Sequence, residues 1–243
     1  MGTRHLVTIV KDGEFKLAQY GQWDGYPSGQ GVTVVEFFNN GDVEALKANV
    51  DKLRYIDDEQ ADALYQTIGI PSGQEWLNMD QSAAIKNTFP TLHRDIGAGI
   101  LEIIASGRAE LQDDSGSSYI PTANSLAFAG GFGCEWVHTI DLDKGTYEIY
   151  EGGFEAEGEP NRFTDVLKKE YEGSGESPSF VTLKAEYSLD AMPTWQEFLA
   201  ELAPEALQRR LDWLAHQAAE DEKDEVAAED QPTPDPEKPT WAM

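Results

Sequence analysis

The sequence has a single cysteine, few basic residues and no long apolar run, and each shortage excludes a class of protein. Cys134 alone cannot form an internal disulfide, and it cannot supply the two thiolates that many structural zinc sites need. No run of about 18 apolar residues is present, and the amino terminus lacks the apolar stretch of a signal peptide. We therefore expect a cytoplasmic protein that does not span a membrane.

Basic residues are outnumbered along the whole chain. The 45 Asp and Glu residues against 18 Lys and Arg residues give a formal net charge of -27. Residues 201–243 carry -8 of this charge, so residues 1–200 carry -19 and are acidic in their own right. A field of this sign repels nucleic-acid phosphates and anionic lipid surfaces. Direct binding to nucleic acid or to a membrane is therefore disfavoured.

Histidines are also scarce, and the common cofactor motifs are missing. The four histidines show no metal-ligand spacing; they stand at positions 5, 93, 138 and 216. Gly97-Ala98-Gly99 lacks the third glycine of a dinucleotide fingerprint, because Glu102 stands in its place. We therefore predict no metal site and no bound cofactor.

What is present indicates a folded core with β-hairpins. Hydrophobic residues make up 40% of the chain and aromatic residues 10%, which is enough to bury a core. Strand-forming residues at 5–10 and 14–20 flank Asp12-Gly13, a pair typical of tight hairpin turns. Alternation at 136–142 and 146–150, around the turn at 143–145, predicts a second hairpin, and the same pattern at 181–189 predicts another strand.

Helical spacing occupies the segments between the predicted strands. Val43, Leu46, Val50 and Leu53 recur at helical intervals after Asp42, a residue suited to cap the first amides. Residues 61–68 predict a second helix that ends at Gly69, residues 92–104 a third that ends near Gly107, and residues 194–214 a capped helix interrupted by Pro204. Residues 32–38 fit a strand or a helix equally.

The pattern as a whole predicts an α+β fold with an antiparallel sheet of hairpins and helices packed on it. We expect one domain over residues 1–217. From Ala218 the composition shifts to Glu, Asp, Ala, Lys and Pro, which cannot bury enough apolar surface to offset the entropy of folding. Residues 218–243 are therefore predicted to form a disordered acidic tail.

The stretch AQYGQWDGYPSGQG, residues 18–31, is the strongest candidate for a binding loop. It joins hydrogen-bonding groups and flat apolar faces to four glycines that would let the backbone approach a ligand. The candidate ligand-binding residues are Tyr20, Gln22, Trp23, Asp24, Tyr26 and Gln30. The alternative is that the glycines and Pro27 form turns while Trp23 and Tyr26 pack on the core.

A second candidate follows at His93-Arg94-Asp95, where an acid/base group stands beside an arginine that could bind an anion. On helical geometry His93 and Arg94 point about 100° apart, so both also fit plain solvated positions near a helix end. Cys134 and His138 would lie roughly 13 Å apart on one strand, too far to share a proton. Cys134 is therefore interpreted as a small buried hydrophobe.

Four segments together carry a resemblance to known sequences: MGTRHL, AQYGQWDGYPSGQG, HRDIGAGILEII and CEWVHTIDLDKGTYEIYEG. The chain resembles a family of uncharacterised fungal, bacterial and phage proteins with a Q-(aromatic)-D-G-Y-P-S-G-Q-G core, over roughly residues 1–200. The resemblance implies family membership for Tyr20, Gln22, Asp24, Gly25, Tyr26, Pro27, Gly29, Gln30 and Gly31. It implies no activity and no catalytic residue.

Two function classes remain open at this point. The first is an intracellular binding or interaction protein whose loop at 19–31 recognises a small polar ligand or a partner protein, with Arg94 as a further binding residue. One form of it is an acidic mimic that occupies a nucleic-acid-binding partner. The second is a hydrolase of amide or ester bonds with Asp24 or His93 in acid/base roles, which requires both groups to line one cleft.

Overall fold

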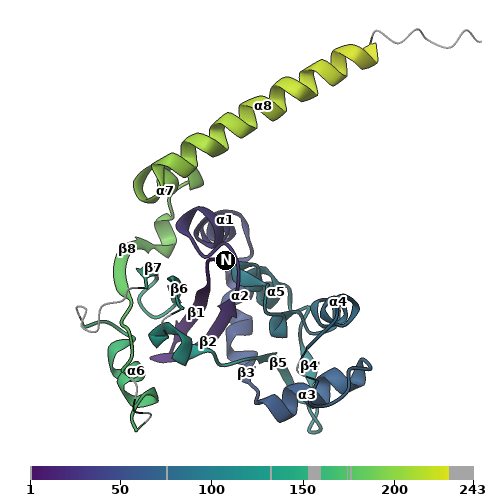
Figure 1. The fold of residues 1–243 in the computed structure, drawn as a ribbon, viewed down its shortest axis with the longest axis vertical. Helices are drawn as coiled ribbons and strands as arrows, with labels where there is room; N and C mark the ends of the chain where they lie inside the picture. The colour runs from purple at the N-terminus through teal and green to yellow at the C-terminus, as the bar shows by residue number, and fades with distance from the viewer. Residues whose placement is uncertain are drawn as a thin grey trace, which may run out of the picture.

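Two β-hairpins that are far apart in sequence lie side by side in the computed structural model, which describes residues 2–74, 76–131, 133–152, 160–173, 175 and 177–229 (Figure 1). The first consists of β1 (His5–Lys11) and β2 (Glu14–Gly21), and the second of β6 (Trp136–Asp141) and β7 (Thr146–Glu151). Asp12 and Gly13 have φ angles of 56° and 72°, as a type I′ turn requires. Both predicted hairpins are confirmed, and β8 (Thr182–Ser188) confirms the further strand.

The main sheet has the strand order β2-β1-β6-β7-β8. Neighbouring strands run antiparallel except β1 and β6, which are parallel. The α+β class is confirmed, but the expectation of an antiparallel sheet is wrong at this pair, and the sheet is mixed. Hairpin turns determine the direction of strands within each hairpin only, whereas the join of β1 to β6 follows a long connection through helices.

A smaller sheet lies beside the first hairpin and has the order β3-β5-β4. It consists of β3 (Leu53–Tyr55), β4 (Leu111–Gln112) and β5 (Ser118–Thr122), with β3 and β5 parallel.

Helices occupy most of the remaining described chain. They are α1 (Val32–Asn40), α2 (Val43–Asn49), α3 (Asp58–Thr67), α4 (Met79–Thr88), α5 (Ile100–Ser106), α6 (Thr164–Glu170), α7 (Trp195–Leu202) and α8 (Pro204–Glu229), with short turns η1 (Pro27–Gly31), η2 (Val50–Lys52), η3 (Pro90–Leu92), η4 (Gly97–Gly99), η5 (Leu126–Gly130) and η6 (Leu189–Ala191). The Asp42 side chain accepts from Ala45 N as predicted, and Thr194 with Glu197 forms the predicted capping box. The ambiguous segment 32–38 is helical.

Two predicted helices are shorter than the spacing indicated. The helix expected from Leu92 begins at Ile100, because Gly97 has a φ angle of +54° and breaks the right-handed path. The helix expected to reach Leu53 ends earlier, and Leu53 begins a strand that pairs with Ile120. In both cases apolar residues at helical intervals reach the core from a different backbone conformation.

The boundary predicted for the tail, at Ala218, falls within a helix. Helix α8 continues through residues 218–229, and it extends away from the rest of the molecule in Figure 1. Ala, Glu and Lys disfavour a buried core but are among the best helix formers, so low apolar content did not exclude a helix here. The rest of the predicted tail, residues 230–243, lies outside the described residues. No described helix is long and apolar enough to cross a bilayer.

Both faces of the main sheet are covered. On one face, Val7 and Ile9 of β1 pack with residues of α1, α2, α5 and α7; this cluster includes Val34, Leu46, Ile100, Ile104 and Phe198. On the other face, Leu6 packs with η5 and α6; this cluster includes Leu126, Val137, Tyr150, Phe163 and Leu167. Alternate residues of β1 therefore point to two different hydrophobic clusters.

A buried ionic network attaches the segment before α6 to the sheet. Arg162 donates to Asp141 Oδ2 at 2.6 Å and to both carboxylate oxygens of Glu148. Tyr150 donates its hydroxyl proton to the same Glu148 carboxylate. The Asp141 and Glu148 side chains are each 3% exposed, and Arg162 is the cation nearest to both carboxylates; Lys144 Nζ lies farther from Glu148, at 3.8 Å.

Replacing Arg162 by Met tests that dependence. We expect Arg162→Met to lower the free energy of unfolding by about 3–5 kcal/mol, because two buried carboxylates lose their nearest cation and its hydrogen bonds. Lys184→Met is the control, since its pair with Glu151 is nearly half exposed on both sides and should be worth less than about 1 kcal/mol. Urea denaturation measures both changes, and equal losses in the two variants would contradict the assigned role of Arg162.

Candidate functional site

The predicted binding loop leaves β2 at Gly21 and enters α1 through the π-helical turn η1. Asp24 takes a left-handed conformation with φ of 57°, which turns the chain back on itself. The backbone of Gly25 donates to Thr3 O at 3.0 Å, and Gln30 N donates to Asp24 O at 2.9 Å. The loop is therefore held against the amino-terminal segment and closed on itself.

Two of the loop glycines are required by a buried histidine. A Cβ atom on Gly21 would lie 2.2 Å from the His5 ring, and one on Gly25 would lie 2.7 Å from His5 Cβ. Real Cβ atoms do not approach other heavy atoms so closely, so any larger residue at either position would displace the ring or the loop. The sequence suggested that the loop glycines let the backbone approach a ligand. In the structure, Gly21 and Gly25 instead approach His5.

Two of the predicted binding residues, Gln30 and Tyr20, make hydrogen bonds within the protein. Gln30 Oε1 accepts from Ala98 N at 2.7 Å, and its Nε2 donates to Trp23 O. Tyr20 donates to Gln22 Oε1 at 2.6 Å, and its ring packs edge-to-face on Phe128. Gln30 and Tyr20 thus stabilise the loop conformation.

His138 connects the loop to the sheet. One of its ring nitrogens, Nε2, lies 2.8 Å from Gly25 O, and the other, Nδ1, lies 2.7 Å from the Tyr147 hydroxyl. A carbonyl only accepts, so Nε2 carries the proton of the neutral ring and Nδ1 accepts from Tyr147. Complete burial lowers the pKa of His138 to about 3, so the ring is neutral at pH 7.

His5 lies beside His138 and has no such partners. Its ring centroid is 6.2 Å from that of His138, the residue is 1% exposed, and neither ring nitrogen makes a hydrogen bond. Burial lowers the pKa of His5 to about 4, although the nearby Thr3 carbonyl and the Asp24 charge act in the opposite direction. Gln19 Oε1 is also buried without a partner. Unpaired buried polar atoms destabilise a closed structure by about 1–3 kcal/mol each.

The outer side of the loop faces a groove. Trp23 and Tyr26 are 49% and 47% exposed, and Tyr26 is part of a groove of about 360 Å³ between the loop and the α7–α8 junction. We call this site the loop groove; it is lined by Tyr26, Pro27, Ser28, Trp136, Leu202, Ala203, Pro204, Glu205, Ala206 and Arg209. Its volume falls within the usual range of small-molecule sites.

Polar groups in the loop groove are available for a ligand. Within the described chain, the hydroxyls of Tyr26 and Ser28 make no hydrogen bond. The Arg209 guanidinium lies 4.0 Å from Glu205, and both side chains are mostly exposed. Sequence reasoning found Tyr26 but missed Trp136 and Arg209, because one is an ordinary strand residue and the other a charged residue in a polar helix.

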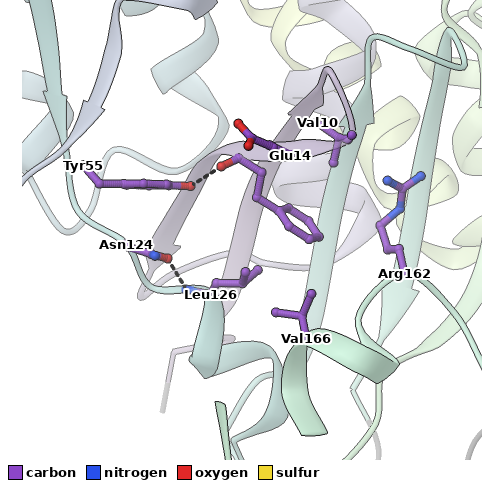
Figure 2. Close-up of a pocket in the computed structure, with 9 residues that line it drawn as sticks. Val10, Glu14, Tyr55, Asn124, Leu126, Arg162 and Val166 are labelled. Atoms are coloured by element: carbon purple, nitrogen blue, oxygen red, sulfur yellow. Dashed lines mark hydrogen bonds between the residues drawn. The ribbon is translucent and has the colours of Figure 1, made fainter. Parts of the chain in front are cut away.

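A second cleft of about 360 Å³ lies where the first hairpin meets β3 and α6 (Figure 2). Most of its polar side chains bond within the protein. Tyr55 donates to Phe15 O, Asn124 Oδ1 accepts from Leu126 N, and Arg162 is bound to its two carboxylates. With these groups engaged, the cleft offers little to orient a ligand, and we assign no site there.

The predicted hydrolase residues have separate partners. His93 Nε2 lies 3.1 Å from Ser82 Oγ, and His93 Nδ1 accepts from Asp95 N at 3.3 Å. The neutral ring then carries its proton on Nε2 and donates to Ser82, the reverse of what a general base does. Burial lowers the pKa of His93, which keeps the ring neutral at pH 7.

Asp24 and His93 interact electrostatically with different residues. Charges that act on His93 come from Asp95, Lys86 and Arg94, whereas the Asp24 carboxylate acts on His5. Arg94 is exposed and forms an ion pair with the adjacent Asp95 at 2.9 Å. In the structure Arg94 is thus paired along the chain, while Asp24 is exposed at the tip of the loop.

Cys134 is buried, as interpreted from the sequence. Its thiol lies against Trp136 O at 3.5 Å, and burial raises the pKa of the thiol to about 12. A thiol of this kind is not a nucleophile at neutral pH. Among the described residues, no three His, Cys, Asp or Glu side chains are placed to hold a metal ion.

Comparisons with protein-family models, curated proteins and solved structures find no match to this chain.

The role of Gln30 can be tested by stability. We expect Gln30→Ala to lower the free energy of unfolding by about 1–3 kcal/mol, because it leaves the Ala98 amide and the Trp23 carbonyl without their partner. Gln208→Ala is a matched control, since Gln208 bonds only to Asp212 on the exposed side of α8 and should change stability by less than about 0.5 kcal/mol. A Gln30 variant as stable as this control, by thermal unfolding, would show that the amide does not hold the loop.

Proposed function

We propose that this chain is an intracellular, cytoplasmic binding protein that recognises a small polar ligand or a segment of a partner protein in the loop groove. The proposal depends on one contrast. In the loop groove, apolar faces surround hydroxyl and guanidinium groups that have no strong internal partner. In the second cleft, between the first hairpin, β3 and α6, most polar side chains are already paired.

The lining of the groove favours one kind of ligand. Arg209 can donate several hydrogen bonds to a carboxylate or an amide oxygen, and the Tyr26 and Ser28 hydroxyls can donate or accept. Trp136 provides a flat apolar face that is partly exposed. We expect a ligand with an oxygen acceptor at one end and an apolar or aromatic group at the other, such as an N-acyl amino acid or a short peptide.

The loop belongs to this site through its outer face. Trp23 and Asp24 are exposed next to Tyr26 and extend the binding surface, while Tyr20, Gln22 and Gln30 keep the loop in shape. Some of the predicted binding residues would therefore contact the ligand, and the others would hold the loop in place.

A thermal-shift screen of N-acyl amino acids and short peptides tests the proposal. A ligand at one hundred times its dissociation constant stabilises a protein by about 2.7 kcal/mol, or very roughly 5–10 °C at this size. We expect Arg209→Ala and Tyr26→Ala each to weaken binding about 10- to 100-fold without changing the melting temperature of the free protein.

Trp213→Ala is the control for that screen, because Trp213 is an exposed aromatic residue on α8 outside the groove. Unchanged affinity in this variant, together with weaker binding in Arg209→Ala and Tyr26→Ala, would assign the ligand to the groove. If Arg209→Ala and Tyr26→Ala bind as tightly as the wild type, the groove is not the site.

The alternatives differ in what they require of the same protein. A hydrolase would need Asp24 or His93 to hold a proton near a substrate, and the hydrogen-bond direction at His93 disfavours it. An acidic mimic would bind a basic partner through its net charge of -27, and its affinity would fall steeply with salt because exposed charges are screened within about 10 Å at 0.1 M. Groove binding to an uncharged peptide would be nearly independent of salt.

A further inference from the structure

The strongest unexplained feature of the structure is the pair of buried, uncharged histidines beneath the loop. His5 has no hydrogen-bond partner, and His138 holds the carbonyl of Gly25. We define the lid as residues 21–31, the segment that covers them. We propose that the lid is a pH-controlled switch: protonation of His5 and His138 releases it from the sheet and so takes apart the loop groove.

The lid is attached where the two histidines lie. Gly25 donates to Thr3 O at 3.0 Å and accepts from His138 Nε2 at 2.8 Å, while its Cα is against the His5 side chain. Movement of Gly25 would therefore break both hydrogen bonds and expose the His5 ring to water. Tyr26, Pro27 and Ser28 follow directly, so the same movement displaces one wall of the loop groove.

The groups around His5 stabilise a positive charge less than burial disfavours it. Gly21 and Gln19 face it from β2, His138 from β6, and Thr3 and Gly25 from the chain that covers it. Among the charges that act on His5, Asp24 is the favourable one, and its side chain is exposed to solvent, where attraction is weakened. A protonated His138 would add repulsion across the 6.2 Å between the two rings.

Protonation of His138 also conflicts with its own hydrogen bonds. A proton on Nδ1 would meet the hydroxyl proton of Tyr147, which currently donates to that nitrogen. Tyr147 is fully buried, and its ring is stacked on Phe198 of α7. The hydroxyl would then have to turn its proton away within an apolar environment, which adds to the cost of a charged ring.

The sign of the pH dependence follows from the two lowered pKa values, about 4 for His5 and about 3 for His138 against 6.5 for an exposed ring. Below pH 6.5 the open form binds protons that the closed form does not. The closed lid is therefore fully favoured above pH 6.5 and loses stability as the pH falls toward 4. Between pH 7 and 5, exposure of His5 alone raises the open fraction about 20-fold, and exposure of both rings raises it about 500-fold.

Amide hydrogen exchange of the full chain measures lid opening directly. We expect the protection factor of the Gly25 amide, corrected for the intrinsic exchange rate, to fall at least about 20-fold between pH 7 and 5. Amides of β7 should keep their protection over the same range. His5→Gln should reduce the fall, and His216→Gln, which changes an exposed histidine on α8, should leave it unchanged.

Ring titration by NMR in the wild-type protein provides an independent check that needs no variant. The switch is supported if two histidine rings have pKa values below 5 and become protonated over the same pH range in which Gly25 loses its protection. A constant Gly25 protection factor from pH 7 to 5 would overturn it, and so would loss of protection at β7 in parallel, because that result means global unfolding.

The consequence for binding depends on the proposed function, but the exchange experiment does not. If the lid opens in acid and no ligand binds the groove, the switch stands and the proposed function fails. If a ligand binds the groove and the Gly25 protection factor stays constant from pH 7 to 5, the proposed function stands and the switch fails.

Discussion

The parallel pairing of β1 with β6 is the constraint on which the rest of the structure depends. It joins two hairpins into one sheet and is marked by a buried hydrogen bond of 2.8 Å between the hydroxyls of Thr8 and Thr139, which are 131 residues apart in the sequence. The register places Val7 opposite His138, and therefore brings His5 and His138 together beneath the loop. Without this pairing the loop would have no surface to close on.

Local features of the fold were predictable because the groups that produce them are neighbours in the sequence. Asp12-Gly13 forms its turn and Thr194 caps its helix within four residues, so composition and spacing are sufficient. The parallel join was not predictable, because either edge of each hairpin has the same alternating pattern. The start of α5 was missed because Gly97 lies against the side chain of Gln30, 67 residues earlier, a contact that the sequence does not reveal.

The loop at 18–31 was recognisable in the sequence, but the contacts of its residues were not. An aromatic and amide-rich loop after a hairpin is a recognisable signal. Whether Gln30 faces a ligand or the protein is decided by Ala98, and the groove beside Tyr26 is completed by Trp136 and Arg209 from two distant segments. His5 and His138 appear in the sequence as ordinary strand residues, and only the register of the sheet shows that they are neighbours.

Helix α8 has a consequence for how the protein responds to heat. Its 26 residues span about 39 Å. All of residues 211–220 except Gln217 are exposed, so this part of the helix receives little support from tertiary packing. Isolated helices are marginal in water, and acidic residues near a carboxyl end oppose the helix dipole. The outer turns are therefore governed by a helix–coil equilibrium of their own. They fray gradually on warming, while the sheet and its two hydrophobic clusters unfold together at a higher temperature.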